Sequence, residues 1–365
     1  MARRPRHYDH WQRGAYWPFC SHSDARIDLT QSLQREGRTD AFVPRAFEFC
    51  TFLCLECVEA DATETAAPPV QRSFHDGQCG TGIYQTADMA YEGLMGPLLT
   101  LEVHEALRAA ARAGRPKIEC TLDLARSTTM VDVSAAGWSW QGERFPHLEI
   151  CKDRTIYHWI DGAFQSVARF TTSLVKLVPT RFGPPTFEID GIKMLPTARV
   201  SPYADAERKV ELIQPHGRVI LDTCGGLGYF AGWCLQKHAK RVLSYEKNPD
   251  VIWLRSLNPW SPEVGSGLTL EQVDITEGIG LLPDKSVDAV LHDPPRFGIA
   301  GELYSQAFYE HLSRVLKANG KLFHYTGTPN KLTSGRDVPG EVAKRLRRAG
   351  FVTAFNGDGV LAVKK

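Results

Sequence analysis

Residues 219–231, VILDTCGGLGYFA, constrain the fold more than any other stretch of the chain. An apolar run ends at an acid, breaks into glycines and resumes as a helical pattern, which is typical of a buried parallel strand, a tight turn and a helix beginning near Gly228. Glycines permit positive φ and a close approach of backbone N–H groups to a ligand, and a helix N-terminus carries partial positive charge. The stretch therefore predicts a site for a nucleotide-like ligand.

Three further short strands follow this turn, and each ends at or beside an acid. Glu246 closes the strand at 241–246, Asp274 closes the one at 268–274, and Asp293 follows the one at 287–292. In an open α/β sheet the carboxyl ends of the strands line the ligand crevice, and an acid roughly 20 residues beyond the glycines binds two ribose hydroxyls. The pattern predicts that these acids meet Asp222 at one edge of a sheet.

These four segments resemble the cofactor-site motifs of class I S-adenosylmethionine-dependent methyltransferases. Three sequences, HDPPRF at 292–297, AGELY at 300–304 and FHYTG at 323–327, narrow the resemblance to a predicted methyltransferase family, best known from archaea and related to spermidine synthases. The resemblance covers about residues 115–365. It implies an α/β fold with a Rossmann-like, doubly wound, seven-stranded methyltransferase sheet, preceded by a small antiparallel β domain. It also implies S-adenosyl-L-methionine as the cofactor.

The resemblance assigns the cofactor to the turn and the strand ends. The cofactor-binding residues it implies are Asp222, Cys224, Gly226, Gly228, Glu246, Asp274 and Asp293. Among them, Glu246 matches the acid that binds the ribose and Asp274 the acid beside the adenine. The chain departs from the family pattern at Cys224, where the first glycine of Asp-x-Gly-x-Gly-x-Gly would stand. A small side chain at that position is compatible with cofactor binding.

The sequence Asp293-Pro294-Pro295 can be explained by the chemistry of methyl transfer. Proline lacks a backbone donor and fixes φ, so two prolines after a strand-end acid turn the chain and hold its carboxylate and carbonyl toward the methyl sulfonium. A substrate amine can donate to these acceptors, and catalysis is then mostly positioning for in-line transfer. An Asp that only caps a helix is the structural alternative. His292 and His324 are candidate general bases, and Tyr325 joins Asp293 and the histidines in the candidate catalytic set.

Enzymes that methylate C5 of uracil through a cysteine adduct also carry an Asp-Pro-Pro-Arg sequence. Their route needs a thiolate at the next strand end, where this chain has YTGTPN at 325–330 and no cysteine. We therefore predict transfer to a nitrogen of a small molecule, RNA or protein, with oxygen or sulfur less favoured. Two alternatives stay open: an aminopropyltransferase of the spermidine-synthase type, and a module that binds S-adenosylmethionine without turnover. The sequence does not identify the methyl acceptor.

Length and net charge limit the classes of protein and of binding partner that the chain can represent. The 365 residues, 43% of them hydrophobic, can bury a sizeable core. A formal net charge of +1 gives no overall attraction to nucleic acid or membranes. No apolar run reaches the ~20 residues that span a bilayer, and the basic N-terminus lacks the apolar core of a secretion signal. We expect a cytoplasmic protein that binds neither membranes nor duplex DNA. Basic groups such as KRLRR at 344–348 leave RNA open, and the oligomeric state is not indicated.

The pattern divides the chain into three parts. Residues 1–114 form a poorly readable N-terminal extension with helices, including a helix at 89–113. Residues 115–200 form the small β domain, with strands at 118–124, 129–133, 149–152 and 174–178 and a hairpin at Asp190-Gly191. Residues 201–365 form the S-adenosylmethionine-binding methyltransferase domain, with helices at 205–213, 308–316 and 341–349 and closing strands at 351–354 and 360–363. In it, the sequence Asn258-Pro259-Trp260 is expected near the adenine.

Aromatic residues of the small β domain have two possible roles. Trp138, Trp140, Tyr157 and Trp159 are expected mainly in its core, and stacking on a planar substrate is the alternative.

Cysteines 50, 54 and 57 stand at a spacing that matches iron–sulfur ligation. They lie in an apolar run, FCTFLCL at 49–55, in which cysteine behaves as a small hydrophobe. We therefore expect Cys50, Cys54 and Cys57 to be core thiols and predict no metal. An iron–sulfur cluster, or a zinc site that also uses Cys20, His22 or Cys79, is the alternative. Without a secretion signal, the thiols are expected to be reduced.

Overall fold

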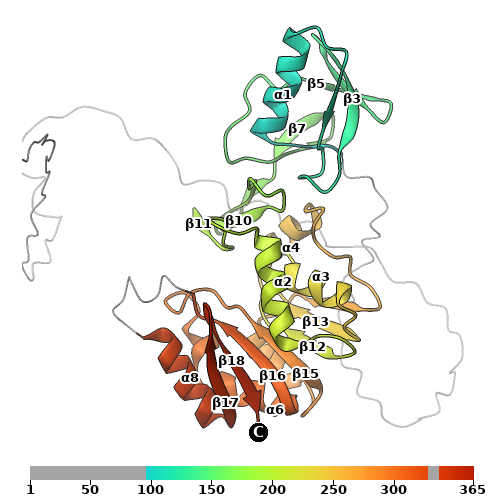
Figure 1. Cartoon of the computed structure of the whole chain (residues 1–365). Coiled ribbons are helices and arrows are strands. Elements are labelled where there is room, and N and C mark those ends of the chain that lie inside the picture. The colour runs from blue at the N-terminus through green and yellow to red at the C-terminus, as the bar shows by residue number, and fades with distance from the viewer. Residues whose placement is uncertain (1–95, 328–336) are drawn as a thin grey trace, which may run out of the picture. The chain divides into compact units, whose positions relative to one another are not determined.

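The computed structural model describes residues 96–327 and 337–365 of the chain, and its elements carry the labels of Figure 1. Contacts divide the chain into Met1–Tyr84 and Gln85–Lys365, and all described residues belong to the second unit. The predictions for Cys50, Cys54 and Cys57, and most of the predicted N-terminal extension, lie outside the described residues.

Short antiparallel sheets make up the described residues before the main sheet (Figure 1). Their strand orders are β1-β6-β7, β2-β3-β4-β5 and β11-β10-β9-β8. The bounds are β1 (Leu98–Leu99), α1 (Leu101–Arg112), β2 (Lys117–Cys120), β3 (Thr129–Ser134), β4 (Gly137–Trp140), β5 (Glu143–Pro146), β6 (Tyr157–Ile160), β7 (Ala163–Ser166), β8 (Ala168–Phe170), β9 (Leu174–Val178), β10 (Thr186–Ile189) and β11 (Ile192–Lys193). The predicted hairpin is confirmed: Asp190 and Gly191 join β10 to β11, both with positive φ.

An aromatic core holds the first of these strands to α1. Trp138 and Tyr157 are buried in it, and the Trp138 ring stacks on Phe145 at 4.5 Å between ring centroids. Val103 and Leu107 of α1 belong to the same apolar cluster. The expectation that Trp138 and Tyr157 are core residues is therefore confirmed.

Two predicted elements of this region are wrong in part. The helix expected at 89–113 begins only at Leu101, because Leu98 and Leu99 pair with β6 and the extended Thr100 caps the helix by accepting from the Val103 N–H. The expected strand at 149–152 is irregular backbone. There the Lys152 N–H donates to the Tyr157 hydroxyl instead of to a neighbouring strand.

The main sheet is mixed and has seven strands in the order β14-β13-β12-β15-β16-β18-β17. The first five run parallel, and β18 pairs antiparallel with both β16 and β17. The strand bounds are β12 (Val219–Asp222), β13 (Arg241–Tyr245), β14 (Leu268–Glu271), β15 (Val287–His292), β16 (Leu316–Tyr325), β17 (Phe351–Asn356) and β18 (Gly359–Lys364). All four strands predicted around the glycine turn, and the closing hairpin, are confirmed.

Helices pack against the sheet through two apolar clusters. Alternating strand residues divide between them, since Ile220 lies in one cluster and its neighbour Leu221 in the other. The Ile220 cluster holds residues of α2 (Pro202–Ile213), α3 (Tyr229–Gln236) and α4 (Pro249–Ser256). The Leu221 cluster holds residues of α5 (Ile275–Gly278), η1 (Ile279–Leu281), η2 (Gly301–Tyr304), α6 (Gln306–Val315) and α8 (Val338–Arg348). The central strands are thereby buried on both faces.

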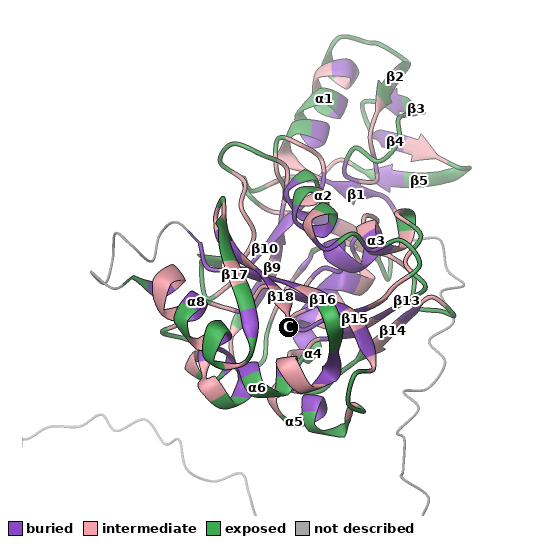
Figure 2. Ribbon diagram, turned by 60° about the horizontal axis from the view of Figure 1, so that its bottom comes forward, coloured by how far each residue is buried: buried purple, intermediate pink, exposed green. Residues whose placement is uncertain are grey.

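The exposure of the strands depends on their position in the sheet (Figure 2). Central β15 is almost entirely buried, whereas β17, drawn largely in green, is the exposed edge strand. Strand β16 begins at Leu316, directly after α6, so residues 317–320 lie inside it. Val287 pairs with Leu316 and Ala289 with Lys321, so the intervening residues bulge without ending the strand.

We predict that Gly137→Ala destabilises the small sheets. A Cβ at Gly137 would collide with the Phe145 carbonyl oxygen of the paired strand, and overpacking of this kind costs about 1–3 kcal/mol. Urea denaturation measures the loss. Gly265→Ala is the control, because a Cβ there meets nothing within 4 Å, and it should change stability by less than about 0.5 kcal/mol. Equal stability of the two variants would contradict the close approach.

Candidate functional site

The glycine turn follows β12 as the sequence predicts. Gly226 and Gly228 both adopt positive φ, +49° and +81°, and Gly228 caps α3. The Gly225 N–H donates to the carbonyl of Tyr245 at 2.7 Å, which ties the turn to the end of β13. A Cβ at Gly226 would meet only the Phe187 ring, at 3.7 Å, within the described residues. Gly226 is therefore a place where another molecule can approach the backbone closely.

Glu246 bridges the turn and the next strand end. One carboxylate oxygen accepts from the Gly226 N–H at 3.0 Å and the other from the Asn248 N–H at 2.9 Å. Burial raises the pKa of Glu246, while these two N–H groups, Arg255 and Lys247 oppose the rise. Each carboxylate oxygen has a second lone pair, so Glu246 can still accept hydroxyl donors.

Asp274 lies one strand further along the same edge. It caps α5 by accepting from the Thr276 N–H at 2.9 Å, and its second oxygen pairs with Lys247 at 3.2 Å. Partial burial would raise the pKa of Asp274, but the bonds from Thr276 and Lys247 lower it. Lys247 follows Glu246 directly in the chain, so Asp274 is linked to the Glu246 end of β13.

Asp293 forms an ion pair with a lysine that the sequence did not single out. The ammonium of Lys209, on α2, lies 3.3 Å from Asp293 Oδ2 and 2.8 Å from Asp205 Oδ2. The Lys209 side chain is only 1% exposed. Burial would lower the pKa of Lys209, but Asp293 and Asp205 raise it, so the ammonium stays charged. Burial raises the pKa of Asp293, and Lys209 opposes that rise.

Tyr325, the last residue of β16, lies beside this ion pair. The Lys209 ammonium stands 3.8 Å from the centroid of the Tyr325 ring, within cation–π range. Burial raises the pKa of the Tyr325 hydroxyl, which is therefore protonated at neutral pH. Asp293, Lys209 and Tyr325 thus form one cluster at the ends of β15 and β16.

The two histidines lie in the core behind this cluster. Neither His292 nor His324 exposes any surface. His292 Nε2 donates to the Leu303 carbonyl and its Nδ1 accepts from Thr223, while His324 pairs with the Tyr325 carbonyl and the Tyr309 hydroxyl. Burial lowers the pKa of His292 to about 4 and that of His324 far below its usual range. This geometry disfavours both as bases, and their catalytic role stays a prediction without structural support.

Asp222 and Cys224 lie at the base of the turn. Asp222 is 1% exposed and accepts from the Ser244 hydroxyl at 2.9 Å. Burial raises the pKa of Asp222 to about 6 and holds the pKa of Cys224 well above its usual range. The Cys224 thiol is therefore protonated at neutral pH.

The sequence also gave no indication of Arg255, on α4. Its guanidinium lies against the glycine turn: a Cβ at Gly228 would meet Arg255 Cζ at 2.5 Å, and one at Gly225 would meet Nη1 at 3.2 Å. No spacing rule could have identified Arg255 or Lys209, because each meets the site through packing of a helix on the sheet.

The sequence Asn258-Pro259-Trp260 contacts both the loop after β2 and the start of α3. The Trp260 indole donates to the Leu124 carbonyl at 3.0 Å, and its ring packs on Tyr203 of α2. Arg126 donates to the Pro259 carbonyl. The Asn258 side chain donates to the Tyr229 hydroxyl at 3.2 Å, so these residues join α4 both to the loop after β2 and to the start of α3. Their expected place near the adenine stays a prediction.

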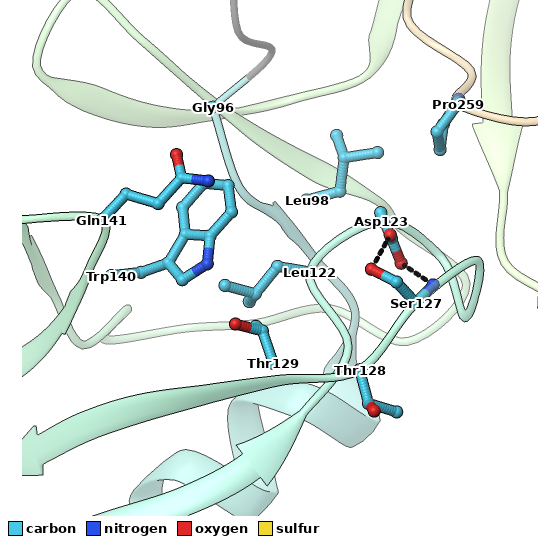
Figure 3. Close-up of a pocket in the computed structure, with 10 residues that line it drawn as sticks. All are labelled: Gly96, Leu98, Leu122, Asp123, Ser127, Thr128, Thr129, Trp140, Gln141 and Pro259. Carbon is cyan, nitrogen blue, oxygen red and sulfur yellow. Dashed lines mark hydrogen bonds between the residues drawn. The ribbon is translucent and has the colours of Figure 1, made fainter.

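A cavity of about 290 Å³ lies beside this junction (Figure 3). Trp140 lines it, and this partly buried residue also packs against the apolar cluster that contains Trp138. Asp123 also lines it, but its carboxylate accepts from the Ser127 N–H, at 2.9 Å, and from the Ser127 hydroxyl. The carboxylate therefore holds its own loop together.

Among residues 96–327 and 337–365, no three His, Cys, Asp or Glu side chains gather closely enough to hold a metal ion. Over the same residues, no helix has both the length and the apolar character needed to cross a membrane.

Comparison with known proteins gives one informative relative. The uncharacterized protein MJ1233 of Methanocaldococcus jannaschii is 42% identical over 222 residues, which are 59% of this chain and 76% of that protein. The chain belongs to the family of MJ1233. Models of protein families gave no match.

Solved structures similar to this chain include a spermidine synthase and S-adenosylmethionine-dependent methyltransferases, the two kinds of protein that the sequence resembles. Spermidine synthase from Thermotoga maritima is 14% identical, with 56% of this chain and 75% of that chain covered and a TM-score of 0.43. An S-adenosylmethionine-dependent methyltransferase from Mesorhizobium loti is 18% identical, with 44% and 94% covered and a TM-score of 0.32. Likeness at this level concerns the fold, so what the site binds must be inferred from its own residues.

We predict that His292 makes the folded state sensitive to acid. Its pKa falls from 6.5 to about 4 on folding, so the unfolded chain binds more protons in that window. The stability that His292 contributes is complete above pH 6.5 and is lost as the pH falls to 4, by roughly 3 kcal/mol. Urea denaturation at several pH values should show a shallower loss for His292→Gln. Identical slopes for variant and wild type would contradict this.

Proposed function

We propose that this protein is an S-adenosylmethionine-dependent methyltransferase that transfers the methyl group to a nitrogen of a small-molecule, RNA or protein acceptor. The observation that supports this best is the Glu246 carboxylate, which accepts the Gly226 N–H at 3.0 Å across the ends of β12 and β13. A carboxylate in that place can accept hydrogen bonds from both ribose hydroxyls of an adenosyl group, while the backbone of the glycine turn lies close to the same group. We also propose a cytoplasmic location.

The residues of the turn fit the cofactor. The backbone of Gly226 can be approached, because the Phe187 ring is the only described group within 4 Å of its Cβ position. Glu246 would hold the ribose, and Asp274, with one oxygen paired to Lys247, would lie toward the adenine. Cys224 and Gly228 shape the turn itself. S-adenosylmethionine supplies an electrophilic methyl group on a positively charged sulfur.

Asp293 is the proposed positioning group for the acceptor. Lys209 binds its Oδ2, and within the described part of the chain Oδ1 has no hydrogen-bond partner. Oδ1 can therefore accept an N–H of the acceptor and aim the nitrogen lone pair along the S–CH₃ axis. As the C–N bond forms and the S–CH₃ bond breaks, Asp293 can take the proton that the nitrogen releases.

The short strands before the sheet are proposed to shape the substrate entrance. Phe187 of β10 faces Gly226, and the Tyr229 hydroxyl at the start of α3 donates to the Pro185 carbonyl at 2.7 Å. These contacts support a small β domain that precedes a doubly wound sheet and reaches its glycine turn. A bulky acceptor would have to pass Phe187.

Radiolabelled methyl transfer tests the proposal. The chain is incubated with S-adenosylmethionine labelled at the methyl group and a cell extract, which is then separated into small molecules, RNA and protein. The pool that carries the label identifies the class of acceptor. Removing that pool from the extract beforehand should abolish the labelling. Binding of the cofactor without label in any pool would favour the module without turnover. Turnover of decarboxylated S-adenosylmethionine with an amine would favour the aminopropyltransferase.

We predict that Glu246→Ala weakens S-adenosylmethionine binding about 10-fold to 150-fold, because it removes charge-assisted hydrogen bonds worth about 1.5–3 kcal/mol. Isothermal titration calorimetry measures the change. Glu271→Ala is the matched control, since this exposed residue ends the neighbouring β14 and pairs in register with Tyr245. Equal affinity of both variants would remove Glu246 from the cofactor site.

For Asp293→Asn we predict a defect in transfer rather than in binding. Cofactor affinity should stay within about threefold of wild type, whereas single-turnover methyl transfer to the labelled pool should fall about 10²-fold to 10⁴-fold. Asp288→Asn removes a carboxylate from the other end of β15 and should leave the rate unchanged. Transfer at the wild-type rate by Asp293→Asn would mean that the Asp-Pro-Pro turn is only structural.

A further inference from the structure

Arg255 fills the space beneath the glycine turn. A Cβ at Gly228 would lie 2.5 Å from Arg255 Cζ, 2.7 Å from Arg255 Nη2 and 2.8 Å from Arg255 Nε. Atoms that are not bonded cannot approach so closely, so the guanidinium and a side chain at 228 exclude each other. Gly228 is thus required on two grounds, its φ of +81° and the presence of Arg255.

Two nitrogens of the buried guanidinium lack a hydrogen bond within the described part of the chain. Arg255 is 3% exposed, and neither Nη1 nor Nη2 has a partner among the residues the structure describes. Asp222 Oδ1 is likewise buried and unpaired within that part of the chain. Such a group is costly in a protein interior, since its lost hydration is not replaced by hydrogen bonds. Packing alone would be served better by an apolar side chain.

The charges around Arg255 come from two strands of the cofactor edge. Burial lowers the pKa of Arg255, and Asp222 of β12 and Glu246 beyond β13 both oppose that fall. Glu246 also interacts with Lys247 and with the Cys224 thiol, and Asp222 with Asp293. Arg255 therefore supplies positive charge to two carboxylates near the glycine turn, the buried Asp222 and the half-buried Glu246.

We propose that Arg255 is a positioning residue of the cofactor site, which supports the glycine turn from below and holds the carboxylates of Asp222 and Glu246 ionised without occupying their acceptor atoms. The proposal rests on the proposed function, since it concerns the same cofactor. It assigns Arg255 an electrostatic task that an apolar residue of equal size cannot perform.

A pH dependence follows from this task. Burial raises the pKa of Glu246 and Arg255 opposes that rise, so removal of the guanidinium should raise the Glu246 pKa further. Only the ionised carboxylate accepts two hydroxyl donors. Cofactor affinity without Arg255 should therefore fall as the pH drops through the raised pKa, at a higher pH than in wild type.

Calorimetric titration with S-adenosylhomocysteine between pH 6 and pH 8.5 tests this, because that probe lacks the sulfonium charge. Arg255→Met should bind more weakly than wild type at the acid end of this range, with a deficit that approaches about tenfold for each unit by which the Glu246 pKa rises only where the pH lies below both pKa values, and the deficit should shrink toward pH 8.5. Arg255→Lys should keep the wild-type pH profile. Arg241→Met, at the far end of β13, is the control and should match wild type throughout.

The same deficit at every pH, shared by Arg255→Met and Arg255→Lys, would overturn the electrostatic part, since loss of shape would then explain it. Affinity unchanged in Arg255→Met would overturn the whole proposal. If the wild-type chain binds neither S-adenosylhomocysteine nor S-adenosylmethionine, the proposed function itself is wrong and this inference falls with it.

A double variant tests the packing should Arg255→Met be unstable. Gly228→Ala should lower the thermal midpoint of the wild-type chain, because its methyl group meets the guanidinium. In the Arg255→Ala background the same change should cost less, since only the backbone strain at φ +81° remains. Equal losses in both backgrounds would show that Arg255 does not support the turn.

Discussion

The parallel pairing of β12 with β13 on one side and β15 on the other determines the rest of the site. Asp222 pairs with Ser244 and with Leu291, so the residues that follow the three strands leave the sheet at one edge. Glu246 and Asp293 reach the glycine turn for that reason and not through any local preference. A shift of one residue in either pairing would turn alternate side chains to the opposite face and separate these carboxylates.

Local signals were sufficient to predict this edge. The apolar run, the acid and the glycines at 219–228 specify strand, turn and helix within one stretch, and the same holds for the strands before Glu246 and Asp293. Side-chain direction at a strand end is not local. His292 pairs with His324 in register, and both rings enter the core, where they pack at 4.4 Å between centroids. The sequence places two histidines at strand ends but does not show which way they point.

The two buried cations, Lys209 and Arg255, could not be predicted from the sequence for another reason. Lys209 meets Asp293 across 84 positions of chain, and Arg255 reaches the turn because α4 packs in one apolar cluster with residues of β12 and β13. On its own helix Lys209 follows Asp205 by four residues, the spacing of an ordinary surface ion pair. Nothing in that spacing shows that the pair is buried. The contacts of Asn258-Pro259-Trp260 could not be predicted for the same reason, since Leu124 and Tyr203 lie on separate elements.

The two cations solve one electrostatic problem in different ways. A site for a positively charged cofactor needs carboxylates, yet buried carboxylates become protonated unless positive charge is near. Lys209 binds Asp293 directly, which uses one oxygen and fixes the orientation of the other. Arg255 stands near Asp222 and Glu246 without a hydrogen bond to either. In the proposed site, the Glu246 oxygens therefore remain charged and available to a ribose, whereas Asp293 would need only one free oxygen to orient an incoming nitrogen.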